Sequence, residues 1–258
     1  MKIKGFLLKV LNAFEDLFMT NHSCVCCGRE IPDGTTFMLC EKCKSKMEPI
    51  SGNICQKCGD VVSAESVKVC DLCKDANYVF ENNFSCFYYT DTASKIIKKY
   101  KYNSRKYYAK YIAEMMISGG FDFEKVDVIT FVPMGKNRKR ERGFNQAEEI
   151  AKELQKITNK EMLPLLEKVK ESPNQAKLSQ NERRKNLLDS FDVLKENATK
   201  IKNKKIVIID DVFTTGTTLN ECSKVLLKHK PASVRTFTFA KTKFNSPKIW
   251  FFWQFFLL

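Results

Sequence analysis

The sequence predicts an α/β protein: a parallel sheet with helices on both faces, preceded by a small cysteine-rich module. Two observations predict this organisation. Short apolar runs, such as Ile206–Ile209 and most of Val126–Val132, alternate with segments of helical periodicity, which is typical of strands buried on both faces of a parallel sheet. Ahead of them, between Cys24 and Cys73, cysteines recur in closely spaced pairs. With 258 residues, the chain is long enough for a full α/β core and a smaller module.

The amino-acid composition indicates the charge of the partner and the redox state of the compartment. Lys and Arg outnumber Asp and Glu by 44 to 30, a formal charge of +14, which favours an anionic substrate or partner. Eleven cysteines without a signal peptide favour a reducing, cytoplasmic location and metal binding rather than disulfides. Residues 1–22 have the periodicity of an amphipathic helix, and we expect no transmembrane segment. This helix is expected to pack on the module that follows, with a membrane-surface role as the alternative.

Four Cys-x-x-Cys pairs predict two structural zinc sites. Each pair supplies two thiolates from one tight turn, and two pairs complete a tetrahedral Zn²⁺ site with no open position for a substrate. The expected ligands are Cys24, Cys27, Cys40, Cys43, Cys55, Cys58, Cys70 and Cys73. Sequential pairing is the simplest arrangement, and interleaved pairing stays open. Redox pairs are the alternative, but a thioredoxin-like motif occurs once in a βαβ setting, not four times in a loop-rich block.

One strand and the turn after it carry the most explicit chemistry. The strand is expected to end at Asp210 and Asp211, and Thr214-Thr215-Gly216-Thr217-Thr218 then leads into a helical pattern near Leu219. Such a turn suits phosphate, because the unpaired N–H groups and the dipole of the following helix favour an anion. Carboxylates accept hydrogen bonds from sugar hydroxyls or hold Mg²⁺. Together these parts predict a ribose 5-phosphate site, and the alternative is an ordinary Asp/Thr/Gly turn.

The segment after a second expected strand is rich in Lys and Arg, which suits a pyrophosphate. The run Val126–Val132 is followed by a charged loop at residues 136–142, which ends in Arg142, and then by a helix with Ala147 and Ile150 on one face. Because the arginine fork matches phosphate oxygens, this loop is expected to bind a pyrophosphate beside the ribose phosphate. The alternative is a nucleic-acid patch without a catalytic role.

Basic and aromatic residues interleave over Lys98–Lys106, between two expected helices. They would either stack bases and neutralise phosphates of single-stranded DNA, or form a solvated basic helix end beside an anion pocket. Both interpretations stay open.

These motifs resemble the ComF family of competence-associated phosphoribosyltransferase-like proteins. The Asp-Asp and Thr/Gly turn resembles the loop that binds phosphoribosyl pyrophosphate in type I phosphoribosyltransferases. The resemblance to the ComF family lies in the cysteine module in front, in Val132-Pro133, in Arg142-Gly143-Phe144-Asn145-Gln146, and in the later Gln175, Leu178, Arg183 and Asn186. It extends to about Lys241 and implies a double zinc ribbon followed by a type I phosphoribosyltransferase fold, with a link to DNA uptake. The expected units are an N-terminal helix at 1–22, a double zinc ribbon at 23–76, a phosphoribosyltransferase domain at 84–243 and an apolar tail at 244–258.

The resemblance also implies roles for individual residues. Asp210 and Asp211 would hold the ribose hydroxyls or Mg²⁺ of phosphoribosyl pyrophosphate (PRPP), and residues 214–218 would cradle its 5-phosphate. Arg142 would stabilise the departing pyrophosphate, and residues 168–186 resemble a mobile hood over the site. Two functions stay open: a phosphoribosyltransferase with an unidentified acceptor, and a non-catalytic PRPP or nucleotide sensor or single-stranded-DNA-binding accessory of the DNA-uptake machinery. The tail is too short to span a bilayer.

Overall fold

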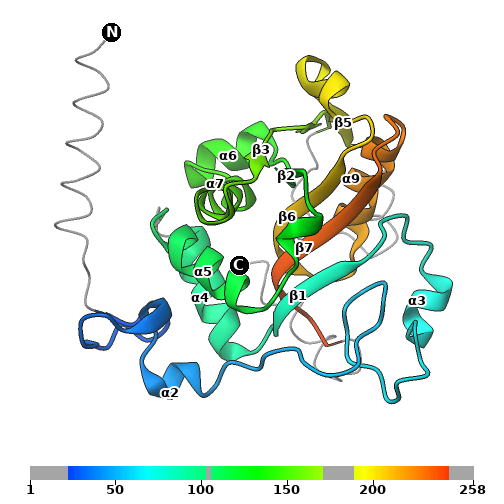
Figure 1. The fold of residues 1–258 in the computed structure, drawn as a ribbon. Coiled ribbons are helices and arrows are strands. Elements are labelled where there is room, and N and C mark those ends of the chain that lie inside the picture. The colour runs from blue at the N-terminus through cyan, green and yellow to red at the C-terminus, as the bar shows by residue number, and fades with distance from the viewer. Residues whose placement is uncertain (1–22, 103–105, 171–188, 244–258) are drawn as a thin grey trace, which may run out of the picture.

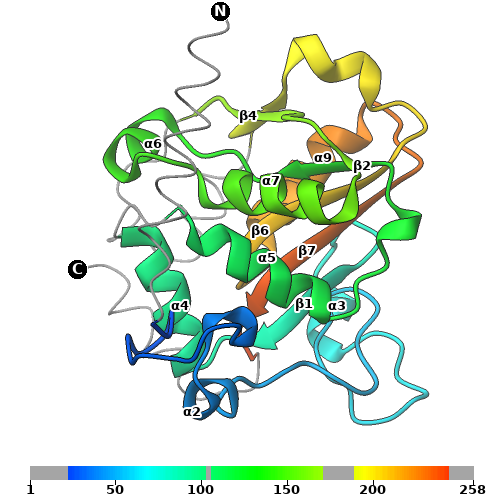
Figure 2. The same ribbon diagram turned by 60° about the vertical axis from the view of Figure 1, so that its left-hand side comes forward.

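The structure, a computed structural model, describes residues 23–102, 106–170 and 189–243. The predicted N-terminal helix, the apolar tail and most of the predicted hood lie outside these ranges. Within them, a five-stranded parallel sheet carries helices on both faces (Figures 1 and 2), which confirms the predicted α/β class. No helix in these ranges has both the length and the apolar character needed to cross a bilayer.

The central strand of the sheet is β6, which follows a basic stretch and is buried along Ile206–Ile209. The strand order is β1-β7-β6-β2-β3, and every neighbouring pair is parallel. A separate antiparallel pair joins β4 to β5. The strands are β1 (Asn83–Tyr88), β2 (Val128–Phe131), β3 (Glu161–Met162), β4 (Leu166–Lys168), β5 (Phe191–Val193), β6 (Lys205–Phe213) and β7 (Ser233–Lys241).

The sheet separates two hydrophobic clusters. Helices α4 (Asp91–Tyr102), α5 (Tyr108–Ser118) and α7 (Gln146–Thr158) share one cluster with Val207 and Ile209 of β6. Helix α9 (Thr217–Leu227) shares the other with Ile206 and Ile208. Because side chains alternate along a strand, β6 serves both layers. The shorter helices are η1 (Thr36–Met38), α2 (Glu41–Lys44), α3 (Asp71–Asp75), η2 (Phe123–Lys125), α6 (Lys136–Arg142) and η4 (Lys195–Lys200).

The two halves of the cysteine-rich segment join different clusters. Val25, Ile31 and Leu39 pack into the cluster of α4, α5 and α7, whereas Val62 and Phe80 pack into that of α9. Each half therefore covers apolar surface of the α/β domain. The bounds of the predicted units stay predictions, although packing joins the cysteine-rich segment closely to the sheet.

Two local predictions were wrong. The expected loop at 136–142 is helix α6, because its Lys, Arg and Glu residues are good helix formers and Gly143, at φ 78°, ends it in the left-handed conformation. Strand β6 does not stop at the two carboxylates, because pairing with β7 continues through Val212 and Phe213. Asp210 and Asp211 still lie at the carboxyl end of the sheet.

Candidate functional site

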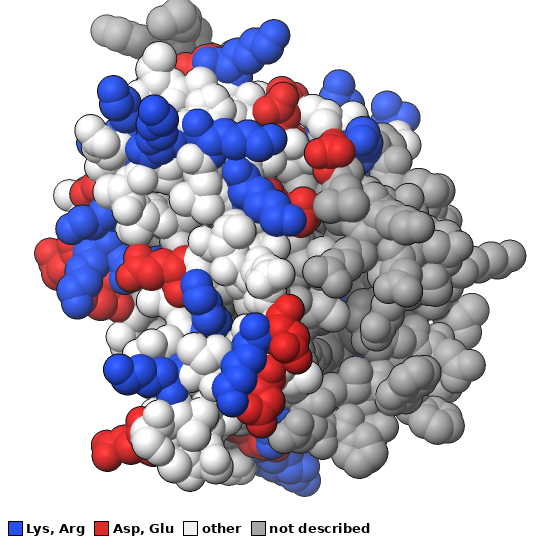
Figure 3. Space-filling view, turned by 90° about the vertical axis from the view of Figure 1, so that its right-hand side faces the viewer, with Lys and Arg blue, Asp and Glu red and all other residues white. Residues whose placement is uncertain are grey.

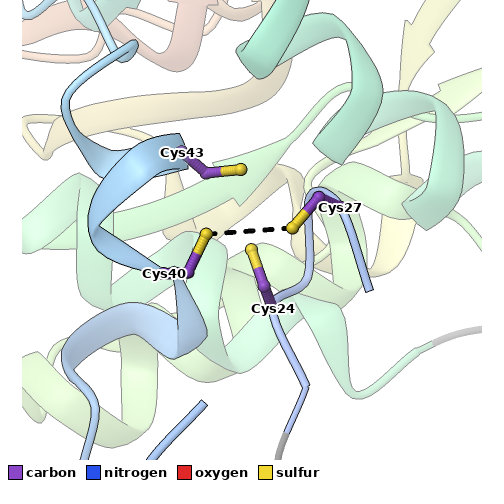
Figure 4. Close-up of side chains that lie close together, drawn as sticks. All are labelled: Cys24, Cys27, Cys40 and Cys43. Carbon is purple, nitrogen blue, oxygen red and sulfur yellow. Dashed lines mark hydrogen bonds between the residues drawn. The ribbon is translucent and has the colours of Figure 1, made fainter. Parts of the chain in front are cut away.

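The first four-cysteine cluster is built from Cys24, Cys27, Cys40 and Cys43, whose sulfur atoms lie within 4.8 Å of one another. Figure 4 shows the side chains converging from the loop that carries Cys24 and from the start of α2. The Cys27 and Cys40 sulfurs are 3.8 Å apart. A tetrahedral site with Zn–S bonds of about 2.3 Å has S–S edges of about 3.8 Å. The four thiols therefore have the spacing that zinc requires.

The second cluster is built from Cys55, Cys58, Cys70 and Cys73, and its Cys58 and Cys70 sulfurs are also 3.8 Å apart. Two backbone N–H groups donate to the Cys55 sulfur, from Lys57 at 3.4 Å and from Cys70 at 3.3 Å. A hydrogen bond from Cys73, with the Lys241 ammonium nearby, lowers the pKa of Cys58 to about 6 despite its burial. Cys58 is therefore the thiol of this cluster that ionises readily, whereas the pKa values of Cys70 and Cys73 are raised.

Sequential pairing is confirmed by these two clusters. Each supplies four thiolates and no open position, so the chemistry of both is structural rather than catalytic. Cys26 lies beside the first cluster, yet its thiol points to the Thr92 carbonyl at 4.0 Å, consistent with its omission from the expected ligands.

The predicted phosphate turn lies between β6 and α9. Gly216 is the N-cap of α9 at φ 67°, a conformation that favours glycine. The hydroxyls of Thr215 and Thr217 lie 2.9 Å apart, so they share one side of the turn. The first N–H groups of α9 have no intrahelical acceptor and are oriented for an anion. The turn therefore has the local geometry expected for phosphate binding. We call residues 214–218 the phosphate loop.

The two carboxylates have different environments. The Lys101 ammonium lies 2.5 Å from Asp211 Oδ2, with only 17% and 11% of the two side chains exposed. Burial opposes ionisation of Asp211, but Lys101 outweighs it and lowers the pKa of this carboxyl. Burial, and then the Asp211 charge, raise the pKa of Asp210 well above its usual range. The pair therefore contains one stable anion and one carboxyl that resists ionisation.

Sequence reasoning did not assign Lys101 to this site. It grouped Lys101 with the basic and aromatic stretch, whereas α4 brings it to the end of β6. A signal was present, because Ala93, Ile97 and Lys101 recur at four-residue intervals, and the first two are fully buried. A lysine on the apolar stripe of a helix needs a buried partner.

Arg142, at the end of α6, acts on Asp211 through its charge. Its charge contributes to lowering the pKa of Asp211, and its Nη1 donates to Gln146 Oε1 at 3.2 Å. Gln146 is 4% exposed, and its backbone carbonyl accepts a hydrogen bond from the Tyr100 hydroxyl at 2.8 Å. Among the described residues, Gln146 Nε2 has no acceptor. Lys101 and Arg142 thus both place positive charge near Asp211, and Gln146 accepts a hydrogen bond from Arg142.

The sequence matches two domain families: a double zinc ribbon domain at residues 15–75 and a phosphoribosyl transferase domain at residues 140–249. Competence protein F of Haemophilus influenzae is 28% identical over 148 residues, which are 55% of this chain and 64% of that protein. Competence protein ComFC of Bacillus subtilis is 29% identical over 217 residues, 79% of this chain and 84% of that protein. DNA utilization protein YhgH of Escherichia coli O157:H7 is 25% identical over 161 residues, 60% of this chain and 69% of that protein.

The chain spans just under two thirds of the length of the Haemophilus relative. Solved hypoxanthine phosphoribosyltransferases also match at 14–18% identity, covering 53–56% of this chain and 63–70% of theirs. The TM-scores of these matches are 0.29–0.33.

The domain matches, the sheet order and the paired cysteine clusters define the class: a double zinc ribbon joined to a phosphoribosyl transferase domain. Within that class, the chain is a relative of the ComF competence proteins, which confirms the resemblance found in the sequence.

Proposed function

We propose that this protein binds PRPP with Mg²⁺ at the carboxyl end of β6. One observation carries the proposal: Asp210 and Asp211 on β6 are followed by Gly216 in the left-handed conformation and then by helix α9. Lys101 pairs with Asp211 at the same place. Carboxylates that precede a phosphate loop match a sugar whose hydroxyls neighbour its phosphate. The phosphoribosyl transferase domain match supports this assignment.

Each part of the site would have a separate task. The N–H groups of α9 and the hydroxyls of Thr215 and Thr217 would hold the 5-phosphate, and the carboxylates would hold the ribose hydroxyls. Mg²⁺, when bound, would neutralise pyrophosphate charge. Lys101 and Arg142 would bind the same anion from α4 and α6, and Gln146 would hold Arg142 in orientation.

For transfer, a nucleophilic nitrogen would attack the anomeric carbon. The new C–N bond would form as the C–O bond to pyrophosphate breaks, and the leaving group would take the electron pair. Lys101 and Arg142 would stabilise that negative charge, so the reaction would depend on positioning and electrostatics rather than on a protein nucleophile. The acceptor is not identified by any residue of the described site.

A second candidate function is binding of single-stranded DNA without transfer. Helix α6 favours it, because Lys136, Arg138, Lys139 and Arg140 are exposed on one short helix beside the site. On the face that carries α3, by contrast, Lys and Arg are interspersed with Asp and Glu (Figure 3). The names of the relatives, which include competence and DNA utilization, support a DNA-linked role.

Calorimetric titration of PRPP with Mg²⁺ tests the main proposal. The double variant Asp210→Asn/Asp211→Asn should lose binding, whereas Asp192→Asn, an exposed carboxylate on β5, should bind as the wild type does. Absence of wild-type binding would refute the PRPP assignment. Pyrophosphate release with one member of a panel of bases would establish transfer and name its acceptor.

The same preparation tests the DNA candidate. Replacing Arg138 and Arg140 by Glu should weaken binding of a labelled single strand in low salt, and should weaken PRPP binding less than Asp210→Asn/Asp211→Asn does. Unchanged DNA affinity would exclude α6 as the DNA-binding surface.

A further inference from the structure

The segment that leaves the second zinc ribbon contacts the phosphate loop directly. The Tyr78 hydroxyl donates to the Thr215 carbonyl at 2.8 Å. The next residue, Val79, donates its backbone N–H to Asn220 Oδ1 of α9, also at 2.8 Å. Tyr78 is only five positions after the last ligand cysteine, Cys73. The segment that leaves the ribbon is therefore joined by one hydrogen bond to the loop and by another to the first turn of α9, across a long sequence separation.

Aromatic packing reinforces these hydrogen bonds. The rings of Tyr78 and Phe80 stack at 4.9 Å, and both meet Phe213 at the end of β6 edge to face. A Cβ at Gly216 would lie 2.6 Å from Phe213 and 3.0 Å from Tyr78. The backbone of the phosphate loop thus rests on the two rings, with no space for a side chain between them.

The other cysteine pair of the second ribbon reaches the same region by a different route. Asp60, just after Cys58, pairs with the fully buried Lys241 at 2.9 Å. Beside Lys241, the Thr242 N–H donates to the Phe213 carbonyl at 3.0 Å, and its hydroxyl donates to the Thr214 carbonyl at 3.3 Å. The first half of the second ribbon is therefore linked to the loop indirectly, because Asp60 pairs with Lys241 and the next residue, Thr242, holds the Thr214 carbonyl.

The first ribbon does not share this arrangement. Its Val25 carbonyl accepts a hydrogen bond from Tyr108 of α5 at 3.3 Å, and its apolar residues pack in the cluster on the other side of the sheet. Among the hydrogen bonds of the described residues, those that reach the phosphate loop from outside β6 and α9 come from Tyr78, next to the second ribbon, and from Thr242, after β7, and none comes from the first ribbon.

We propose that the second zinc ribbon is the support of the phosphate loop and that Tyr78 is the positioning residue between them. Folding of the ribbon around its four thiolates places Tyr78, and Tyr78 holds the Thr215 carbonyl so that the N–H groups of α9 face the ligand. Because such coupling is reciprocal, a ligand in the loop stabilises the second ribbon, and the folded ribbon strengthens ligand binding. The coupling between ligand binding and ribbon stability rests on the proposed PRPP function, whereas the role of Tyr78 in ordering the phosphate loop does not.

Hydrogen exchange of a peptide covering residues 214–220 tests the role of Tyr78 in the loop without any ligand, because it includes the Asn220 N–H that donates to the Gly216 carbonyl at 2.8 Å. Tyr78→Phe removes one hydroxyl and keeps the ring, so the loop should exchange about fivefold faster, the equivalent of one net hydrogen bond. Its zinc content should match the wild type. The control is Tyr108→Phe, which removes the hydroxyl that donates to the first ribbon and should leave loop exchange unchanged. Equal loop exchange in Tyr78→Phe and wild type would overturn the inference, whether or not PRPP binds.

Two further measurements separate the inference from the proposed function. PRPP with Mg²⁺ should slow removal of one of the two zinc ions by a chelator, and this protection should be lost in Tyr78→Phe. Cys70→Ser, in the second ribbon, should speed hydrogen exchange of the phosphate loop more than Cys40→Ser, in the first ribbon, does. If either cysteine variant fails to fold, the exchange rate in Tyr78→Phe still tests the support role. If the wild type binds no PRPP while Tyr78→Phe still loosens the loop, the proposed function fails and the support role stands.

Discussion

The buried ion pair between Lys241 and Asp60 offers a sharp test of how the second ribbon is attached. The Lys241 side chain is fully buried, Asp60 is 15% exposed, and the two are 2.9 Å apart. Breaking a buried pair costs about 3–5 kcal/mol, because it leaves one uncompensated charge. In Lys241→Met, Asp60 keeps some solvent and the Tyr88 hydroxyl at 2.8 Å. We therefore expect the lower figure, about 3 kcal/mol, for this variant.

The opposite substitution should cost more. Asp60→Asn leaves an ammonium with no exposed surface, so about 5 kcal/mol is expected. The double variant Lys241→Met/Asp60→Asn should lose less free energy of unfolding than the sum of the two single losses, because no unpaired charge is then left buried.

Thermal unfolding at fixed excess zinc measures these differences. For a chain of this size, about 3 kcal/mol lowers the melting temperature by roughly 6–12 °C. Lys243→Met is the matched control: its pair with Glu48 is 48% and 50% exposed, so it should cost less than about 1 kcal/mol. Equal melting temperatures for Lys241→Met and Lys243→Met would refute the claim that this ion pair anchors the ribbon.

Four further outcomes are expected. Metal analysis of the reduced protein should find two zinc ions per chain, and Cys40→Ser or Cys70→Ser should each retain about one if the ribbons fold independently. The pKa of Asp210 is raised in the folded protein, so the folded state loses stability as the pH rises above the pKa of Asp210 in the unfolded chain. Asp210→Asn removes this loss and should have a higher melting temperature than the wild type at pH 7. The difference in melting temperature should vanish near pH ~4, where Asp210 is protonated in both states. Gly216→Ala should lower the melting temperature by strain at φ 67° and by the 2.6 Å approach to Phe213, and calorimetry should show lost PRPP binding. Lys101→Met should weaken PRPP binding about tenfold or more in the same assay, and unchanged affinity would place Lys101 outside the site.

The candidate site shows where sequence reasoning succeeds and where it stops. Asp210, Asp211 and Gly216 follow one another in the chain, so their relation to a strand and a helix start was predictable from local pattern. The pairing of Lys101 with Asp211 was not predicted, because the two residues are 110 positions apart and only the packing of α4 on the sheet brings them together. The segment 136–142 was predicted as a loop because of its high charge, although its Lys, Arg and Glu residues are good helix formers and the segment is helix α6.

The sequence by itself determined the chemistry that is encoded at short range: paired cysteines for zinc, a buried central strand, and a Thr/Gly turn between that strand and a helix. Tertiary structure alone decided how these pieces support one another. It placed the first ribbon against α5 and the second against the phosphate loop, and it brought Lys101 to Asp211 and Tyr78 to Thr215. The physical reason is that turn and strand propensities act over a few residues, whereas these contacts depend on which apolar surfaces meet when the whole sheet is covered.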